Sequence, residues 1–256
     1  NEDPTNEDIT LTFEVDEEII IIDGGNWTRV TNEDPTDKTI RYTLDVSENG
    51  IYEITYKDLA GHTGSASYEV ENIDKTPAKT TLIPSTGGQT MNPVTLTLTS
   101  DEPLIITSTT DEWTASADKK TFTLVVTSNR TVTVEYTDLA GNAGSKTYTV
   151  SNIDTEVPTA TIEADTTEST NQDITLTLNA SEEIVITSTT DEWTKVTGSE
   201  YTLVVSDNRT VTVEFKDLAG HIGSVSYTVA NIDKIPATAD VTYSNTNLTN
   251  QDVVIT

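Results

Sequence analysis

The chain has 256 residues, of which 43 are Asp or Glu and 14 are Lys or Arg, so its formal net charge is −29. A field this negative repels nucleic acid and anionic lipid, which excludes both as direct partners. The sequence contains no cysteine, which excludes disulfides, and no apolar run is long enough for a transmembrane helix, which argues against direct membrane insertion.

One pair of motifs recurs along the chain: D-L-A-G, followed eleven residues after its Gly by N-I-D. Its copies are Asp58–Gly61 with Asn72–Asp74, Asp138–Gly141 with Asn152–Asp154, and Asp217–Gly220 with Asn231–Asp233. The spacings of 80 and 79 residues predict a tandem array of one folding unit. The expected domains are residues 1–74, 75–154 and 155–233, called repeats 1, 2 and 3 below, with the start of a fourth at 234–256.

Repeat 1 begins atypically. Thr5–Thr10 (T-N-E-D-I-T) matches Thr170–Thr175 (T-N-Q-D-I-T) inside repeat 3, so repeat 1 lacks the strand that should precede this motif. It also has about six extra residues between Trp27 and Asp58, which predict a longer loop around residues 32–38.

Repeat 2 follows the common plan. Its Asp111–Thr114 (D-E-W-T) matches Asp191–Thr194 of repeat 3, and the segment Thr131–Tyr136 alternates apolar and polar residues. That period of two is typical of strands with one buried face. No segment of the chain shows convincing helical periodicity.

Repeat 3 shows the clearest strand pattern. The predicted strands are residues 157–165, 173–179, 184–187, 201–205, 210–215 and 223–229. Short strands rich in Thr and Val, with a turn every few residues, indicate an immunoglobulin-like β-sandwich. The fold class predicted for the chain is therefore all-β, with tandem immunoglobulin-like β-sandwiches in an elongated array.

The tail begins the same plan once more, with a predicted first strand at residues 237–243 and Thr249–Asp252 (T-N-Q-D) as the start of a second. The tail thus has the strand that repeat 1 lacks. One hypothesis is that the 237–256 strands of one molecule pair with repeat 1 of another, since strand addition satisfies an open sheet edge. The alternative is an arbitrary boundary with a loosely held tail.

The D-L-A-G-N/H-x-x-G-S motif, followed by Y-x-V-x-N-I-D and a nearby Pro, resembles the bacterial immunoglobulin-like repeats of large cell-surface proteins and adhesins. The opening T-N-Q-D-I-T-L-T-L-x-A-S-E-E-I is similar to the same family. Repeat 2 departs from the pattern at Met91–Pro93 and Pro103. The resemblance implies an extracellular or cell-surface location on a bacterium, and the absence of an initiator Met and of a signal segment suggests a piece of a longer, processed protein.

Acidic residues recur where such a sandwich receives its incoming linker. The turn after the second strand, the D-L-A-G turn and the N-I-D linker all fall at that pole. Oxygen ligands in this number suit Ca²⁺, which takes six to eight of them. The predicted ligands are Asn72, Asp74, Asp101, Glu102 and Asp138 at the first junction, Asn152, Asp154, Glu182, Glu183 and Asp217 at the second, and, more weakly in the end repeats, Glu17, Asp58, Asn231 and Asp233.

The alternative interpretation of these acids is purely structural: Asp before Leu-Ala-Gly caps a tight turn, and the Asp of N-I-D bonds its own backbone. The recurring Trp27, Trp113 and Trp193 are interpreted as core residues, although an exposed Trp would suit carbohydrate. His62, Asn142 and His221 share one turn position and are expected to be exposed. The lysines do not recur at one strand position, which argues against an isopeptide crosslink.

No nucleophile motif, phosphate loop or paired-His metal site is present, so we do not expect an enzyme. The predicted function is a stalk or spacer in a bacterial surface adhesin or extracellular fibrous protein, in contact with neighbouring repeats and stiffened by Ca²⁺. The alternatives are a self-assembling filament or surface-layer subunit that uses strand complementation, and a module that binds carbohydrate or a host protein.

Overall fold

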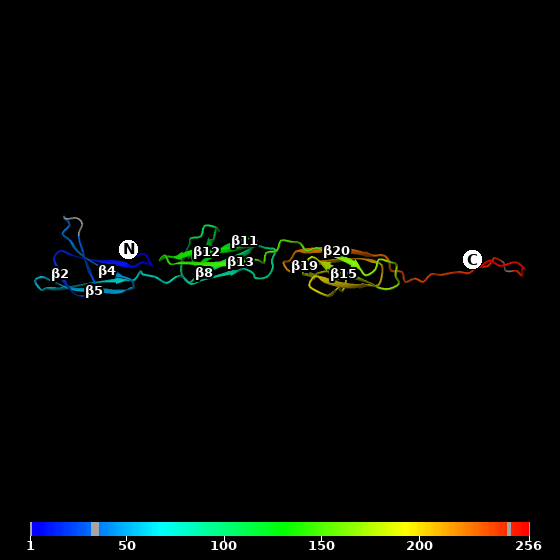
Figure 1. Cartoon of the computed structure of the whole chain (residues 1–256), viewed down its shortest axis with the longest axis horizontal. Helices are drawn as coiled ribbons and strands as arrows, with labels where there is room; N and C mark the ends of the chain where they lie inside the picture. Colours follow the sequence, from blue (N-terminus) through cyan, green and yellow to red (C-terminus); the bar gives the residue numbers. More distant parts are fainter. Residues whose placement is uncertain (1, 32–35, 245–246, 256) are drawn as a thin grey trace. The chain divides into compact units, whose positions relative to one another are not determined.

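The computed structural model describes residues 2–31, 36–244 and 247–255, and these residues form twenty β-strands and no helix (Figure 1). The prediction of an all-β chain is confirmed. Within this described part, no helix is available that is long and apolar enough to cross a membrane. The strands form because apolar and polar residues alternate along the sequence. In β12 (Arg130–Asp138), for example, Val132, Val134 and Tyr136 are buried while the residues between them are exposed.

Two compact units make up the chain. One unit comprises residues 1–87 and 92–153, and the other comprises residues 88–91 and 154–256. The strands of repeats 1 and 2 belong to the first unit, and those of repeat 3 belong to the second.

Repeat 1 contains β1 (Ile9–Val15), β2 (Ile19–Asp23), β3 (Thr28–Val30), β4 (Ile40–Val46), β5 (Gly50–Asp58) and β6 (Thr63–Val70). They form two three-stranded sheets in the orders β1-β4-β3 and β2-β5-β6. Among the described residues, β1 lies at the edge of its sheet. The predicted loop at 32–38 falls largely on residues 32–35, which lie outside the described residues.

Repeat 2 contains β7 (Thr80–Pro84), β8 (Val94–Ser100), β9 (Leu104–Ile106), β10 (Thr114–Ala115), β11 (Thr121–Val126), β12 and β13 (Ala143–Val150). The sheets have the orders β10-β11-β8-β7 and β13-β12-β9, and all their pairings are antiparallel. Side chains from both sheets meet in the core, where Leu96 and Leu98 of β8 face Val132 and Val134 of β12. Two antiparallel sheets around one core constitute an immunoglobulin-like sandwich.

Repeat 3 contains β14 (Ala160–Ala164), β15 (Ile174–Ala180), β16 (Ile184–Ile186), β17 (Thr194–Lys195), β18 (Glu200–Val205), β19 (Arg209–Asp217) and β20 (Ile222–Val229). Its sheet orders, β14-β15-β18-β17 and β16-β19-β20, reproduce those of repeat 2. All six predicted strands are present within a few residues of their expected ends. The two-residue β17 was not predicted because it is too short to show a period.

The three tryptophans pack against the cores of their own repeats and are half-buried, as predicted. In repeat 1, the indole N–H of Trp27 donates to the carbonyl oxygen of Gly24 at 3.0 Å. The buried Nε1 atoms of Trp113 and Trp193 have no hydrogen-bond partner among the described residues. This packing fits the predicted role of the tryptophans as core residues.

The tail does not form the predicted strand. Residues 237–243 contain no strand, and the described tail shows only an isolated antiparallel bridge between Tyr243 and Ile255. The sequence pattern suits a strand, but a strand needs a neighbouring edge for its hydrogen bonds, and the tail has no sheet of its own to join.

An asparagine clamp fixes the end of each repeat. The side chain of Asn129 accepts from the N–H of Ile153 at 2.9 Å and donates to the carbonyl oxygen of the same residue at 2.8 Å. Equivalent pairs join Asn49 to Ile73 and Asn208 to Ile232. Each isoleucine is buried in the core of its repeat, so the clamp fixes the position of the aspartate that follows it.

Candidate metal centres

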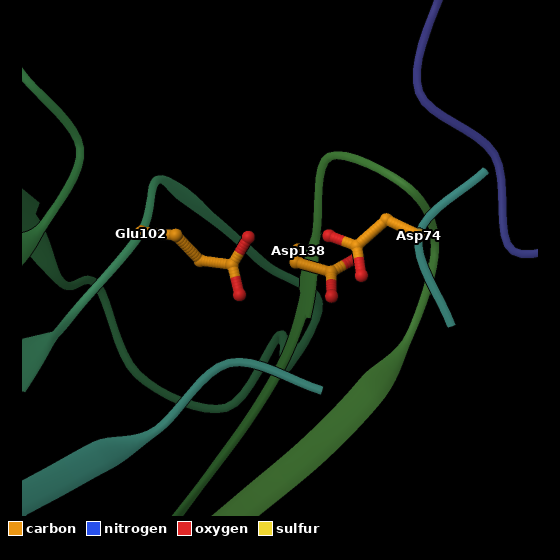
Figure 2. Close-up of side chains that lie close together, drawn as sticks. All are labelled: Asp74, Glu102 and Asp138. Atoms are coloured by element: carbon orange, nitrogen blue, oxygen red, sulfur yellow. The ribbon is translucent and has the colours of Figure 1, made fainter. Parts of the chain in front are cut away.

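Three carboxylates from separate parts of the chain meet at the start of repeat 2. Asp74 lies in the linker that follows Ile73, Glu102 in the turn between β8 and β9, and Asp138 at the end of β12. One oxygen from each carboxylate lies within 4.8 Å of the others. Figure 2 shows the carboxylates of Asp74 and Asp138 next to each other, with that of Glu102 facing them.

The same arrangement recurs at the start of repeat 3. Asp154 follows Ile153 in the linker, Glu182 lies in the turn between β15 and β16, and Asp217 ends β19. Their oxygens also lie within 4.8 Å of one another. Recurrence at equivalent positions shows that the arrangement belongs to the repeat rather than to an accident of packing. The Asp74–Glu102–Asp138 set is called cluster A below, and the Asp154–Glu182–Asp217 set cluster B.

The D-L-A-G turn holds the buried member of each cluster. In repeat 2, Asp138 is only 1% exposed, and its Oδ1 accepts from the backbone N–H of Asn142 at 2.8 Å. Gly141 has φ of 98°, in the left-handed region that glycine adopts without strain, and this lets the chain return toward the aspartate. The turn-capping interpretation of this Asp is therefore confirmed, and the capping itself directs the carboxylate into the cluster.

The linker aspartates also cap their own backbone. Oδ1 of Asp74 accepts from the N–H of Thr76 at 2.9 Å, and Oδ1 of Asp154 accepts from the N–H of Glu156 at 3.0 Å. A carboxylate that caps a turn with one oxygen still has lone pairs for a cation. Capping and cation binding are thus compatible in these residues.

The glutamate of each cluster differs from the two aspartates in its hydrogen bonding. Neither Glu102 nor Glu182 accepts a hydrogen bond through its side chain from the described residues, and both are half-buried. Burial, followed by the negative charges of Asp138 and Asp74, raises the pKa of Glu102. Burial, followed by the charges of Asp154 and Asp217, raises the pKa of Glu182. The charges of Lys120 and His221 only partly offset these effects on Glu102 and Glu182 respectively.

Asp217 differs because a neighbour compensates for its burial. Burial alone would raise its pKa, but hydrogen bonds from His221 and Gly220 outweigh burial and lower it. Nδ1 of His221 lies 2.8 Å from Oδ2 of the aspartate. Asp217 thus remains ionised while it is only 2% exposed.

Cluster chemistry favours a hard divalent cation. Each cluster presents three carboxylates, and at close range these repel one another unless a positive charge lies between them. Carboxylate oxygens are the ligands that Ca²⁺ and Mg²⁺ prefer, whereas the clusters contain no thiolate that would favour softer metals. Three carboxylates at close range fit part of the oxygen coordination that Ca²⁺ takes.

The predicted asparagine ligands lie in other contacts. The side-chain amide of Asn72 donates to the carbonyl oxygen of Asp3 at 2.8 Å, and that of Asn152 donates to Thr86 at 3.3 Å. Asn231 donates likewise to Glu168 at 2.8 Å. These amides connect the end of each repeat to its own beginning.

Two predicted acidic ligands also have other roles. Oδ1 of Asp101 accepts from the N–H of Lys79 at 2.9 Å, and Ser181 makes the equivalent bond in repeat 3 through its hydroxyl, so a carboxylate is not needed there. Glu183 lies 3.5 Å from Nζ of Lys195 in an exposed ion pair. Of the five ligands predicted at each junction, the structure brings three carboxylates together.

The weaker predicted sites at the two ends do not form clusters among the described residues. In repeat 1, Oδ2 of Asp58 lies 2.7 Å from Nδ1 of His62, and hydrogen bonding to that histidine lowers the pKa of Asp58. Glu17 has no linker aspartate beside it in the described chain. At the other end, Asp233 accepts from the N–H of Ile235 at 2.9 Å.

The sequence interpretation missed the residue after D-L-A-G. Asn142 was expected to be exposed but is 9% exposed, and its amide donates to Oδ2 of Asp138 and to the carbonyl oxygen of Asp74, both at 2.9 Å. The His221 side chain is also mostly buried, at 13% exposed, whereas His62 is 84% exposed as predicted. The available signal was position: each residue follows the capping aspartate by four.

No protein-family model and no curated protein matches this sequence. Among solved structures, the human desmocollin-1 ectodomain is 13% identical, with 87% of this chain and 52% of that chain covered and a TM-score of 0.31. The protocadherin γB4 extracellular domain is 12% identical, with 90% and 45% covered and a TM-score of 0.39. The mouse nectin-like molecule 4 ectodomain is 13% identical, with 92% and 98% covered and a TM-score of 0.32.

The chain spans about half the length of the first two of these structures. Similarities of this size identify neither a family nor a function for the chain. The fold class is shown by the strand order and the two-sheet cores described above.

Proposed function

We propose that this chain is a structural segment, a stalk or spacer, of an extracellular fibrous protein or surface adhesin of a bacterium, and that Ca²⁺ stiffens its linkers. The observation that carries the proposal is the recurrence of one three-carboxylate cluster at the start of repeats 2 and 3, each with one aspartate supplied by the linker.

The proposed mechanism rests on two adjacent residues. Ile73 is buried in the core of repeat 1, and the next residue, Asp74, belongs to cluster A of repeat 2. Ile153 and Asp154 repeat this arrangement at the following linker. A cation that holds the aspartate against the two loop carboxylates restrains the backbone directly after the buried isoleucine, so little free chain remains between repeats.

The electrostatics of the clusters support the same proposal. Without a cation, Glu102 and Glu182 are half-buried, accept no side-chain hydrogen bond from the described residues and face two further carboxylates. An ion that binds only the folded state stabilises it by about 2.7 kcal/mol per site at a hundred times the dissociation constant. For domains of this small size, that is a substantial part of the total stability.

A mechanical role is proposed in preference to a catalytic one. The aspartates of the clusters cap turns, and no nucleophile with an adjacent base accompanies them in the described part of the chain. A module that binds carbohydrate or a host protein is also less supported, because the recurring tryptophans are packed against the repeat cores. The bacterial origin and surface location follow from the sequence resemblance alone and share its status as a proposal.

The test is calcium titration calorimetry together with thermal unfolding in CaCl₂ and in EGTA, at about 0.15 M NaCl to screen the general charge. The parent chain should bind two ions and melt at a higher temperature in CaCl₂. Glu102→Gln and Glu182→Gln should each remove one site, and the double variant should remove both. These two glutamates suit the test because their side chains accept no hydrogen bond from the described residues, so the substitutions should leave the fold intact.

The matched control is Glu17→Gln, at the equivalent turn of repeat 1, where no linker aspartate completes a cluster. This variant should bind calcium like the parent. A calcium-dependent rise in melting temperature that survives in the double variant would contradict the proposed sites, and equal shifts with MgCl₂ would contradict selectivity for Ca²⁺.

A further inference from the structure

Clusters A and B share the hydrogen bonds that hold their linker aspartates. The N–H of the aspartate donates to a threonine carbonyl of the preceding repeat, from Asp74 to Thr5 at 2.8 Å and from Asp154 to Thr90 at 3.0 Å. Oδ1 of each aspartate then caps the N–H two residues later. The segments that follow, residues 74–79 and 154–159, are called linker 1 and linker 2 below, and these matched bonds make them a comparison within one chain.

The buried aspartates are matched as well. Oδ1 of Asp138 accepts from the N–H of Asn142 at 2.8 Å, and Oδ1 of Asp217 accepts from the N–H of His221 at the same distance. Oδ2 is bonded to the side chain of that residue, at 2.9 Å in repeat 2 and 2.8 Å in repeat 3. Histidine in place of asparagine therefore keeps both bonds to the carboxylate.

Linker 1 has an additional bond, which Asn142 makes. A primary amide carries two N–H groups, and Nδ2 of Asn142 donates both to Oδ2 of Asp138 and to the backbone carbonyl oxygen of Asp74, each at 2.9 Å. A ring nitrogen of histidine carries at most one hydrogen. In the described chain, the bond of His221 goes to Asp217 and no bond joins its ring to Asp154.

A second bond reaches the D-L-A-G turn of repeat 2 from the residue after Thr5. The N–H of Asn6 donates to the carbonyl oxygen of Ala140 at 3.0 Å. Met91 has the equivalent position before repeat 3, and among the described residues no such bond joins it to Ala219. Linker 1 is thus restrained by protein bonds that linker 2 lacks.

The charges near the two glutamates are balanced in a similar way. Beyond the clustered aspartates, Asp101 raises the pKa of Glu102 and Lys120 lowers it. The pKa of Glu182 is likewise raised by one further acid and lowered by His221. The clearest difference between the clusters is therefore the restraint on the linker backbone.

We propose that Asn142 is a positioning residue for cluster A. Its bond to the backbone of Asp74 holds linker 1 in place before any cation binds, whereas linker 2 becomes ordered when cluster B takes its cation. The part of this inference that concerns affinity rests on the proposed function, because it requires that the clusters bind Ca²⁺.

The consequence is that the two linkers stiffen at different calcium concentrations. Ordering a segment costs conformational free energy, and a site whose ligands are already fixed does not lose that cost from its binding free energy. Cluster A should bind Ca²⁺ more tightly than cluster B, by up to about tenfold for one net hydrogen bond.

Amide hydrogen exchange of the full chain in EGTA, resolved by NMR, tests the positioning without a cation. The reporters are the N–H groups of Thr76 and Glu156, which cap the two linker aspartates in the same way. The protection factor of Thr76 should exceed that of Glu156 several-fold. Asn142→His, which repeat 3 shows to be compatible with the turn, should remove the difference, and His221→Asn should raise the protection of Glu156. Equal protection in the parent chain, or no effect of Asn142→His, would overturn the proposal.

Calcium titration calorimetry tests the consequence for affinity. Glu182→Gln isolates cluster A, and adding Asn142→His should weaken the remaining site by up to about tenfold. Glu102→Gln isolates cluster B, and adding His221→Asn should strengthen that site. The matched control is His62→Asn, at the same turn position of repeat 1, which should change neither site.

The two measurements separate this inference from the proposed function. Absence of calcium binding would contradict the proposed function, and the exchange data in EGTA would still decide whether Asn142 positions linker 1. Two sites of equal affinity that do not respond to the substitutions at residues 142 and 221 would overturn the positioning role and leave calcium binding intact.

Discussion

At the scale of single residues, the chemistry of the clusters depends on which oxygens remain available after the turns have formed. Asp74 and Asp138 each give one oxygen to a backbone N–H, whereas Glu102 gives none within the described chain. The glutamate is therefore the residue whose charge is least compensated, and it should respond most strongly to cation and to proton.

The pH dependence of repeat 2 should follow from Glu102. Its pKa in the folded state lies above the ordinary value of 4.5 because of burial and nearby carboxylates, so the folded state binds the proton more tightly than the unfolded state. The contribution of this group to stability is fully present below the unfolded pKa and is lost as pH rises through the folded pKa. In EGTA, repeat 2 should therefore become more stable as the pH falls from neutral toward the ordinary glutamate pKa.

Thermal unfolding in EGTA at a series of pH values measures this effect, and Glu102→Gln should flatten the dependence. In CaCl₂ the direction should reverse, because protons compete with the cation for the same oxygens. Asp217 should affect the pH dependence of stability in the opposite direction. Because its pKa is lowered in the folded state, its contribution to stability is present above its unfolded pKa and is lost as the pH falls through the folded pKa. An unchanged profile in the Glu102 variant would contradict the assignment.

At the scale of strands and turns, the asparagine clamp joins the end of each repeat to the turn that precedes β5, β12 or β19. Asn129 satisfies both backbone groups of Ile153, which is buried. Removing the side chain leaves a backbone donor and acceptor with no partner in an apolar setting, at a cost of about 1–3 kcal/mol.

Asn129→Ala should therefore destabilise repeat 2 by about 1–3 kcal/mol, measured by urea unfolding, and should also weaken calcium binding at cluster B because Asp154 loses its fixed position. Asn49→Ala is the parallel variant for repeat 1 and cluster A. The control is Asn179→Ala, which lies on an exposed strand position outside the clamp. A loss of stability with unchanged calcium affinity at cluster B would contradict the link between clamp and cluster.

Prediction from sequence succeeded for the strands, and it included the three carboxylates that lie close together in each cluster. Strands were recognisable because alternation along Thr131–Tyr136 or Thr210–Phe215 directly reflects one buried face. The clustered acids were recognisable because they sit in turns whose place in a sandwich is fixed by strand order.

The sequence of a single repeat does not distinguish Glu183 or Asp101 from the acids that lie in the clusters. Glu183 pairs with Lys195 and Glu18 pairs with Arg29, while repeat 2 has Pro103 and Ala115 in the same two places. Both partners are replaced together, which is the pattern of a cross-strand ion pair and not of a ligand. Comparing the repeats position by position distinguishes Glu183 and Asp101 from the clustered carboxylates, because Pro103 and Ser181 stand in their places in the other repeat.

At the scale of the whole molecule, the net charge of −29 should make stability dependent on ionic strength. In EGTA, raising NaCl should increase the melting temperature, because screening reduces repulsion within clusters A and B and across the surface. In CaCl₂ the increase should be smaller, because bound ions already neutralise part of the clusters. Melting curves over a NaCl series measure both effects, and an equal salt dependence in the two buffers would contradict the prediction. The Glu102→Gln, Glu182→Gln chain serves as the reference.

The adjacency of Ile73 to Asp74, and of Ile153 to Asp154, has a consequence for how such a chain changes its length. Each isoleucine packs in the core of the sandwich that ends, and the carboxylate clusters with two others of the sandwich that begins. A genetic duplication or deletion of one full period at this peptide bond therefore keeps a core isoleucine directly before a clustered aspartate, so the new joint has the same two anchors as the old one.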